Sequence, residues 1–214
     1  MKKTYKQAGM LALSVLLAGC VTGPSPQDVA QATQKVMKSS FRDQGIATTE
    51  WLVQDASNQA CSQAQGAPLD EKLARSIEQA NLQTVKMPSD GKFIGDWREG
   101  EKIAQNGRGM TWSDPPGSAN GGSCYNCHQI SKEELSFGSI GPSLYHYGKL
   151  RGVADPAAAA SKPIVDYTWR KLWNAKAYNA CSGMPRFGHA GILNETQLRH
   201  VMALLLDPSS PVNK

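Results

Sequence analysis

Several features of common functional classes are missing from the sequence. It has no dense run of lysine and arginine with interleaved aromatic residues, which a nucleic-acid-binding surface usually needs. It has no internal repeat and no strong alternation of apolar and polar residues, which argues against half-buried β-strands. The apolar stretch of residues 8–18 is shorter than the roughly 20 residues that span a bilayer. These absences favour a globular and mostly helical protein.

The positive charge gives no support for a nucleic-acid partner either. The formal net charge is +5 and the isoelectric point is about 8.9. Lys2, Lys3 and Lys6, however, belong to a segment that resembles a removable export signal. Without them, 20 basic side chains face 18 acidic ones, so the net charge is only +2. We therefore expect no nucleic-acid partner.

The N-terminus resembles a lipoprotein signal. Lysines precede the apolar stretch, which ends in Leu17-Ala18-Gly19-Cys20, and this order resembles the bacterial lipobox. The interpretation removes residues 1–19 as a signal peptide and attaches lipid to Cys20. The alternative is ordinary cleavage nearby, with Cys20 left free or removed. Val21 in place of Asp favours the outer membrane of a Gram-negative cell. The predicted location is therefore periplasmic, as an outer-membrane-anchored lipoprotein.

The motif Cys124-Tyr125-Asn126-Cys127-His128 fits the C-x-x-C-H signal for attachment of c-type haem. Two thiols one short turn apart can reach the two vinyl groups of one haem, and the next imidazole can lie beneath the iron. We predict one covalent haem c, with Cys124 and Cys127 as attachment points and His128 as an axial ligand. The alternatives are a zinc half-site and a thioredoxin-like redox pair. Zinc would need further ligands, and the redox pair would not require His128.

Two further cysteines, Cys61 and Cys181, have no role in the signal or the motif. In an oxidising compartment they are candidates for a disulfide. The alternative is that Cys181, three residues before Met184, stays free and acts as a thiolate ligand or redox group.

Met184 is the leading candidate for the second axial ligand. It lies 56 residues after His128, before a final helix, in a loop with turn formers on both sides. That order resembles class I cytochromes c, in which a Met-Pro loop carries the sixth ligand. Other candidates are the remaining methionines and His189, His146 and His200. The same resemblance gives the carbonyl of Pro142 the role of accepting the imidazole N–H of His128, although a plain turn proline is the alternative.

Helical periodicity predicts the rest of the organisation. The predicted helices cover residues 26–44, 69–83, 96–105, 163–178 and 194–207. Small residues Gly100 and Ala104 share one face and allow close packing against the last helix. The region around Cys61 is predicted as a loop. The expected fold class is all-α, with a class I cytochrome c-like haem domain at 91–210 and a lipid-anchored N-terminal helical extension at 20–90.

Three stretches together resemble SoxX, the cytochrome subunit of the SoxAX complex of thiosulfate oxidation. They are residues 91–100, 124–148 and 173–208, and within them Gly-Pro-Ser-Leu at 141–144 and Cys-Ser-Gly-Met-Pro-Arg-Phe-Gly at 181–188 are the most specific. The resemblance implies an electron-transfer subunit of an L-cysteine S-thiosulfotransferase. The implied partners are a SoxA-like cytochrome, a SoxYZ-like carrier and a small cytochrome c. The catalytic haem of that family belongs to SoxA, so no catalytic cysteine transfers to this chain.

Two other functions compete with this one. The chain could be an independent monohaem electron carrier tethered to the membrane. It could also be a haem sensor or enzyme in which Met184 leaves the iron on reduction. A His/Met iron has no open position for a substrate, which favours electron relay over sulfur chemistry.

Overall fold

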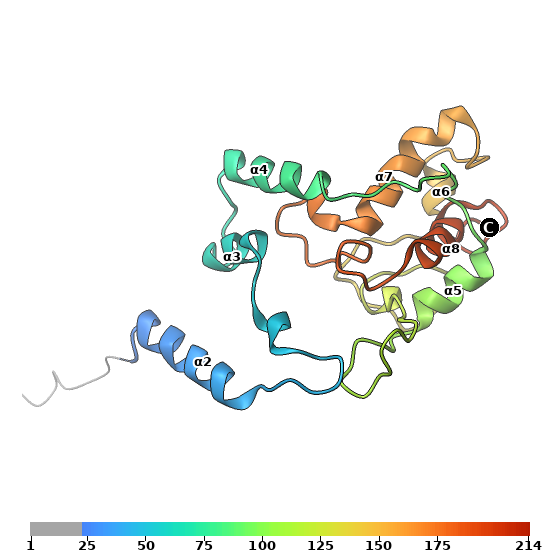
Figure 1. The fold of residues 1–214 in the computed structure, drawn as a ribbon. Coiled ribbons are helices and arrows are strands. Elements are labelled where there is room, and N and C mark those ends of the chain that lie inside the picture. The colour runs from blue at the N-terminus through green and yellow to red at the C-terminus, as the bar shows by residue number, and fades with distance from the viewer. Residues whose placement is uncertain (1–22) are drawn as a thin grey trace, which may run out of the picture. The chain divides into compact units, whose positions relative to one another are not determined.

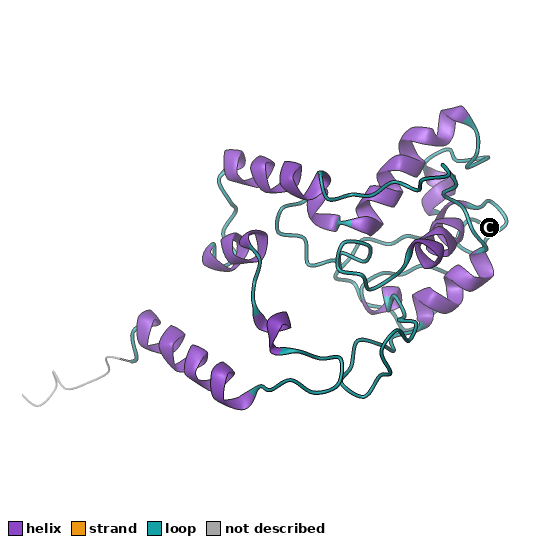
Figure 2. Ribbon diagram, viewed as in Figure 1, coloured by secondary structure: helices purple, strands orange, loops and turns teal. Residues whose placement is uncertain are grey.

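The computed structural model describes residues 23–214, and the regular structure in this range is helical (Figures 1 and 2). The all-α prediction is confirmed for these residues. The elements are α2 (Pro26–Ser40), η1 (Thr49–Leu52), α3 (Ala56–Gln63), α4 (Glu71–Leu82), α5 (Trp97–Gln105), η2 (Cys124–Asn126), α6 (Tyr147–Leu150), η3 (Ala159–Ser161), α7 (Lys162–Trp173), η4 (Ala175–Ala177) and α8 (Glu195–Leu206). The predicted signal peptide, residues 1–19, and Cys20 lie outside the described range. Within that range, no helix combines the length and the apolar character needed to cross a membrane.

The chain divides into two compact units, Met1–Arg42 and Asp43–Lys214. Helix α2 belongs to the first. It begins with a capping box, in which the Asp28 N–H donates to Ser25 Oγ at 3.1 Å and the Ser25 N–H donates to Asp28 Oδ2 at 3.0 Å. None of its residues is buried. The predicted domain boundaries at residues 19 and 90 stay predictions.

The core of the second unit is built on α8, which packs against α5. Seven of the twelve residues of α8 are buried, and a capping box of Asn194 and Gln197 starts the helix as predicted. Gly100 and Ala104 form the buried face of α5. A Cβ atom at Gly100 would lie only 2.1 Å from the carbonyl oxygen of His200. The predicted close approach of these two helices is therefore confirmed.

Replacing Gly100 with alanine is expected to destabilise the protein by about 1–3 kcal/mol, because the added methyl group overlaps backbone that α8 cannot easily move. Denaturant unfolding followed by far-UV circular dichroism measures the change. Arg98→Ala on the same helix is the control, since that side chain is 67% exposed. A Gly100→Ala variant as stable as the control would contradict the close packing.

The predicted helix over 163–178 is too long. Helix α7 ends at Trp173 because Asn174 leaves the helical conformation, with φ of −147° and ψ of 98°. The buried side chain of Asn174 instead donates to Asn81 Oδ1 and to Thr84 Oγ1, both at 3.0 Å. Its own Oδ1 accepts the N–H of Lys176 and begins η4. A buried hydrogen-bond network therefore ends the helix.

The loop predicted around Cys61 is also wrong in part, because residues 56–63 form α3. Asp55 is its N-cap and accepts the N–H of Asn58 at 2.8 Å. The helix is polar, and none of its residues is buried. It therefore lacks the apolar periodicity by which a helix is usually predicted.

Candidate functional site

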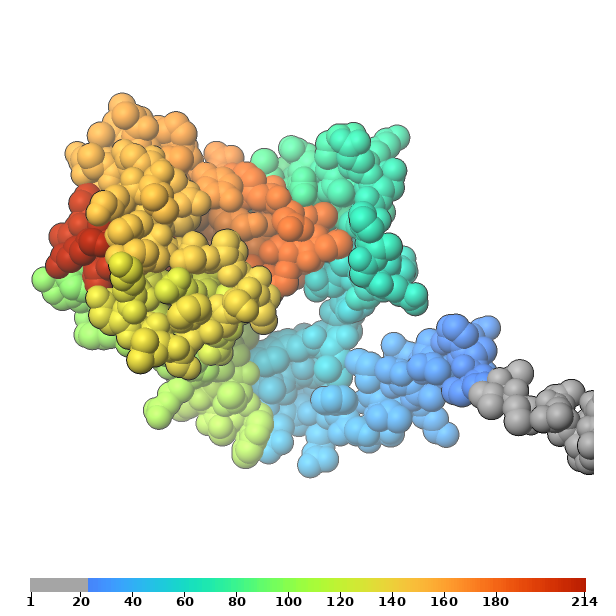
Figure 3. Space-filling model, turned by 180° about the vertical axis from the view of Figure 1, so that it is seen from behind, coloured from blue at the N-terminus to red at the C-terminus, as the bar shows by residue number. Residues whose placement is uncertain are grey.

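A tight turn forms the C-x-x-C-H motif. Ser123 has a left-handed backbone conformation, with φ of 50°, and from it the chain enters η2. The backbone N–H groups of Cys127 and His128 both donate to the carbonyl oxygen of Cys124, at 3.1 and 2.9 Å. The turn thus keeps the two thiols and the imidazole in one short segment. Seen from behind, the yellow to light-orange surface of residues 125–160 faces the viewer (Figure 3).

The environment of the motif cysteines bears on the two alternatives to haem. Cys124 and Cys127 are free thiols. Cys124 packs against the hydrophobic core, and burial raises the pKa of its thiol to about 12. A dithiol redox centre depends on a lowered thiol pKa, so Cys124 does not suit that role. In residues 23–214, no three His, Cys, Asp or Glu side chains are grouped to hold a metal ion.

The imidazole of His128 is held by residues 138–142, which return to the motif. Nδ1 of His128 lies 2.6 Å from the carbonyl oxygen of Pro142, the contact that the resemblance predicts. Because a carbonyl oxygen only accepts hydrogen bonds, Nδ1 carries the proton. The lone pair of the neutral ring is then on Nε2, which is the nitrogen available to a metal.

Gly141 allows this contact by having no side chain. Its N–H donates to the carbonyl of Cys127 at 2.8 Å, and the N–H of Gly138 donates to the carbonyl of Tyr125 at 2.8 Å. A Cβ atom at Gly141 would lie 2.2 Å from Cε1 of His128. The returning segment is therefore pressed directly against the imidazole ring.

Gly141→Ala is expected to break the His128–Pro142 hydrogen bond, because the methyl group would occupy space that the ring now fills. Nitrogen NMR of the histidine ring measures the outcome as a changed Nδ1 signal. Gly183→Ala is the matched control, since a Cβ there would meet no atom within 4 Å. An unchanged His128 signal in Gly141→Ala would show that the ring does not depend on this contact.

Met184 lies in the loop between η4 and α8. Its side chain is half-buried and packs against the same hydrophobic core as Cys124. Asn120, in the loop before the motif, donates its Nδ2–H to the carbonyl of Ile192 at 3.0 Å. Gln197 at the start of α8 donates to the carbonyl of Asn120 at 2.8 Å. The segment after Met184 and the segment before the motif are therefore joined, and Met184 and Cys124 border one core.

Two of the other candidate histidines are engaged elsewhere. His146 Nε2 lies 2.5 Å from the carbonyl oxygen of Lys214, and His200 Nδ1 accepts the N–H of Asp96 at 2.9 Å. Neither ring is free to serve as a ligand without losing that contact. His189 is exposed, and partial loss of solvent together with the charge of Arg186 lowers its pKa. His189 is thus the histidine that competes with Met184.

Trp173 provides a buried donor that lacks a partner among the residues described. Its Nε1 is buried and makes no hydrogen bond. The indole ring lies against Gly188, where a Cβ atom would meet it at 2.4 Å. The backbone carbonyl of Trp173 accepts the N–H of His189 at 3.0 Å. A buried unsatisfied donor costs about 1–3 kcal/mol. This N–H is therefore suited to a ligand that carries an oxygen acceptor.

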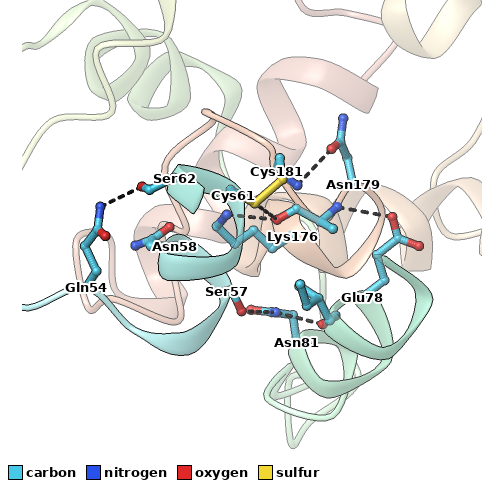
Figure 4. The surroundings of a disulfide bond; sticks show 12 residues. Gln54, Ser57, Asn58, Cys61, Ser62, Glu78, Asn81, Lys176, Asn179 and Cys181 are labelled. Atoms are coloured by element: carbon cyan, nitrogen blue, oxygen red, sulfur yellow. Dashed lines mark hydrogen bonds between the residues drawn. A yellow bond between two sulfur atoms is a disulfide. The ribbon is translucent and has the colours of Figure 1, made fainter. Parts of the chain in front are cut away.

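The predicted disulfide between Cys61 and Cys181 is confirmed (Figure 4). It joins α3 to the loop that contains Met184, across 120 residues of sequence. The alternative of a free Cys181 thiolate, as ligand or redox group, is contradicted by this bond.

No sequence pattern predicts the polar contacts around the disulfide. Arg186 Nη2 lies 2.7 Å from Asp55 Oδ2, and the N–H of Ala180 donates to Glu78 Oε1 at 3.1 Å. These residues come from segments far apart in the chain. The one local signal was the helix-capping tendency of Asp55, which says nothing of its partner.

No family model matches the sequence. An uncharacterized lipoprotein of Aquifex aeolicus (strain VF5) is 33% identical over 188 residues, which cover 87% of this chain and 85% of that protein.

Proposed function

The chain belongs to the same protein family as this lipoprotein of Aquifex aeolicus, and we propose that it is a lipid-anchored, monohaem c-type cytochrome. The lipobox that ends in Cys20 supports the anchor, as does the relative's description as a lipoprotein. The observation that carries the haem proposal is the geometry of His128. Its ring follows two free thiols in a tight turn, and the Pro142 carbonyl holds the ring proton on Nδ1, which leaves the Nε2 lone pair available to a metal. The proposed fold of residues 91–210 is that of a class I cytochrome c.

In this proposal each residue of the motif has a separate role. Cys124 and Cys127 form thioether bonds to the vinyl groups of haem c, and His128 is the proximal ligand. Met184 is the sixth ligand, and its thioether favours the reduced iron relative to a second imidazole. Haem, when bound, supplies an iron that takes up and releases one electron. Pro142 keeps the proton of His128 on Nδ1 and so fixes which nitrogen binds.

The surroundings of the motif fit this cofactor better than they fit zinc or a dithiol. Thioether formation removes the Cys124 thiol from titration, so its raised pKa is no obstacle to the finished site. The haem propionates carry oxygen atoms that accept hydrogen bonds, and Trp173 Nε1–H is a buried donor without an acceptor. The apolar porphyrin also suits the core that Cys124 and Met184 border.

The more specific proposal is that the chain is the electron-transfer subunit of a SoxAX complex. In that role thiosulfate and a carrier cysteine are joined on the partner SoxA, with loss of one proton and two electrons. This chain would pass the electrons singly to a small cytochrome c. An iron with both axial positions filled by His128 and Met184 has no site for thiosulfate, so the sulfur chemistry falls to the partner.

Co-expression with a SoxA-like cytochrome and a haem-maturation system tests the Sox assignment. We expect the two chains to co-purify, and thiosulfate to reduce the haem of this chain when a thiol-bearing SoxYZ-like carrier is present. A haem that stays oxidised with all partners present would contradict the Sox role. The independent membrane-tethered carrier would then be the supported function, because it requires covalent haem but no SoxA.

A further inference from the structure

We propose that α3 positions the axial ligand Met184, with Asp55 and Cys61 as the positioning residues. The inference deepens the proposed function and rests on it, since it concerns the sixth ligand of the haem. In this view the segment before the haem domain takes part in setting the haem's reduction potential. Neither Asp55 nor Cys61 belongs to the haem motif.

Two links from α3 reach the chain on either side of Met184. Cys61 is bonded to Cys181, three residues before Met184. Asp55 pairs with Arg186, two residues after Met184, at 2.7 Å. Because Asp55 and Cys61 cap and form the same helix, the two links are held at a fixed separation of about 9 Å along its axis. The short loop between Cys181 and Arg186 is thereby fixed at both ends.

The ion pair is partly shielded from solvent. The side chain of Arg186 is only 18% exposed and that of Asp55 is 41% exposed, so solvent screens this pair less than a fully open one. Asp55 also caps α3 through Asn58. Burial raises the pKa of Asp55, but the Asn58 N–H and Arg186 outweigh this and hold it below its ordinary value. Asp55 is therefore charged at neutral pH and oriented by two partners.

Helix α3 is in turn held by α4. Asn81, a buried residue of α4, donates its Nδ2–H to Ser57 Oγ of α3 at 3.0 Å (Figure 4). Glu78 of α4 accepts the N–H of Ala180, directly before Cys181. The buried Lys176 ammonium donates to the carbonyl of Ala180 at 2.9 Å. The ligand loop, residues 181–186, is thus joined to α3 and α4 in one hydrogen-bonded unit. We call the disulfide and the Asp55–Arg186 ion pair the bracket.

The two links join the loop at residues 181 and 186, on both sides of Met184. Breaking either link should free the Met184 loop while the remainder of the core, centred on α8, stays packed. The expected consequence is a weaker Met184–iron bond, which lowers the reduction potential because a thioether ligand favours the reduced iron.

The test uses the full-length holoprotein and two bracket variants. Asp55→Ser keeps an N-cap residue but is too short to reach Arg186. The double variant Cys61→Ser/Cys181→Ser removes the disulfide. The matched control is Asp70→Ser, because the hydrogen bonds of the Asp70 side chain go to Lys72 and Leu73 in the first turn of α4. Each is measured for reduction potential, for the Met–iron absorption band, and for hydrogen exchange of residues 182–188.

Both bracket variants are expected to lower the potential, to weaken the band and to speed exchange in 182–188, whereas Asp70→Ser leaves all three unchanged. Bracket variants that keep the wild-type band and potential, even with reduced stability, would overturn the positioning role alone. A wild-type protein without covalent haem, or with a band that survives Met184→Ala, would overturn the proposed function instead. The two failures are therefore distinguishable.

Discussion

Replacing Met184 with alanine is expected to abolish the Met–iron absorption band and to lower the reduction potential. The thioether is the softer of the two proposed ligands and stabilises reduced iron. Axial ligands set haem potentials over a range of roughly 0.8 V, so loss of one should shift the potential far beyond the effect of a surface substitution. Spectroelectrochemical titration of the holoprotein measures both quantities in one experiment.

Two controls make the Met184 result specific. Met87→Ala removes a methionine whose side chain is 36% exposed, and it should leave the band and potential unchanged. His189→Ala removes the competing ligand and should also leave the band unchanged, because the band reports methionine bound to iron. A wild-type protein without the band, or a band that survives Met184→Ala and disappears in another methionine variant, would show that the ligand assignment is wrong.

The second large effect is expected from the disulfide. The double variant Cys61→Ser/Cys181→Ser should lower the free energy of unfolding by about 4–5 kcal/mol, because the bond closes a very long loop in the unfolded chain. The two cysteines are 120 residues apart in the sequence, and the bond joins α3 to the loop between η4 and α8. Denaturant unfolding followed by far-UV circular dichroism gives this free energy directly.

Ser62→Ala on the same helix serves as the control for the cysteine replacements. Ser62 Oγ accepts a hydrogen bond from Gln54 at 2.9 Å on the exposed side of α3, so its loss should cost less than about 1 kcal/mol. A double cysteine variant with an unfolding midpoint equal to that of Ser62→Ala would contradict the stabilising role of the disulfide.

The sequence predicted those parts of the fold whose signals are local. Asn194 and Gln197 mark the start of α8 by a capping box, and the small residues Gly100 and Ala104 mark the face on which α5 and α8 meet. The turn around Cys124 follows from the spacing of the motif. In each case the residues that carry the signal are also those that make the contact.

The rest depended on partners far away in the chain. Asn174 ends α7 because its side chain donates hydrogen bonds to Asn81 and Thr84. The sequence near residue 174 gives no indication of these two partners. Helix α3 is polar and short, and its neighbours are the loop of Arg186 and the helix of Asn81. Cysteine counting predicted the disulfide, but the ion pair beside it had no equivalent signal.

Covalent haem attachment at Cys124 and Cys127 is tested most directly by the mass of the intact polypeptide after extraction of free haem with acidified solvent. The protein should be produced with a haem-maturation system, beside the variant Cys124→Ala/Cys127→Ala. The wild-type chain is expected to keep the added mass of one haem, and the variant to lose it entirely. A wild-type chain whose mass is that of the bare polypeptide would contradict the assignment of this protein as a c-type cytochrome.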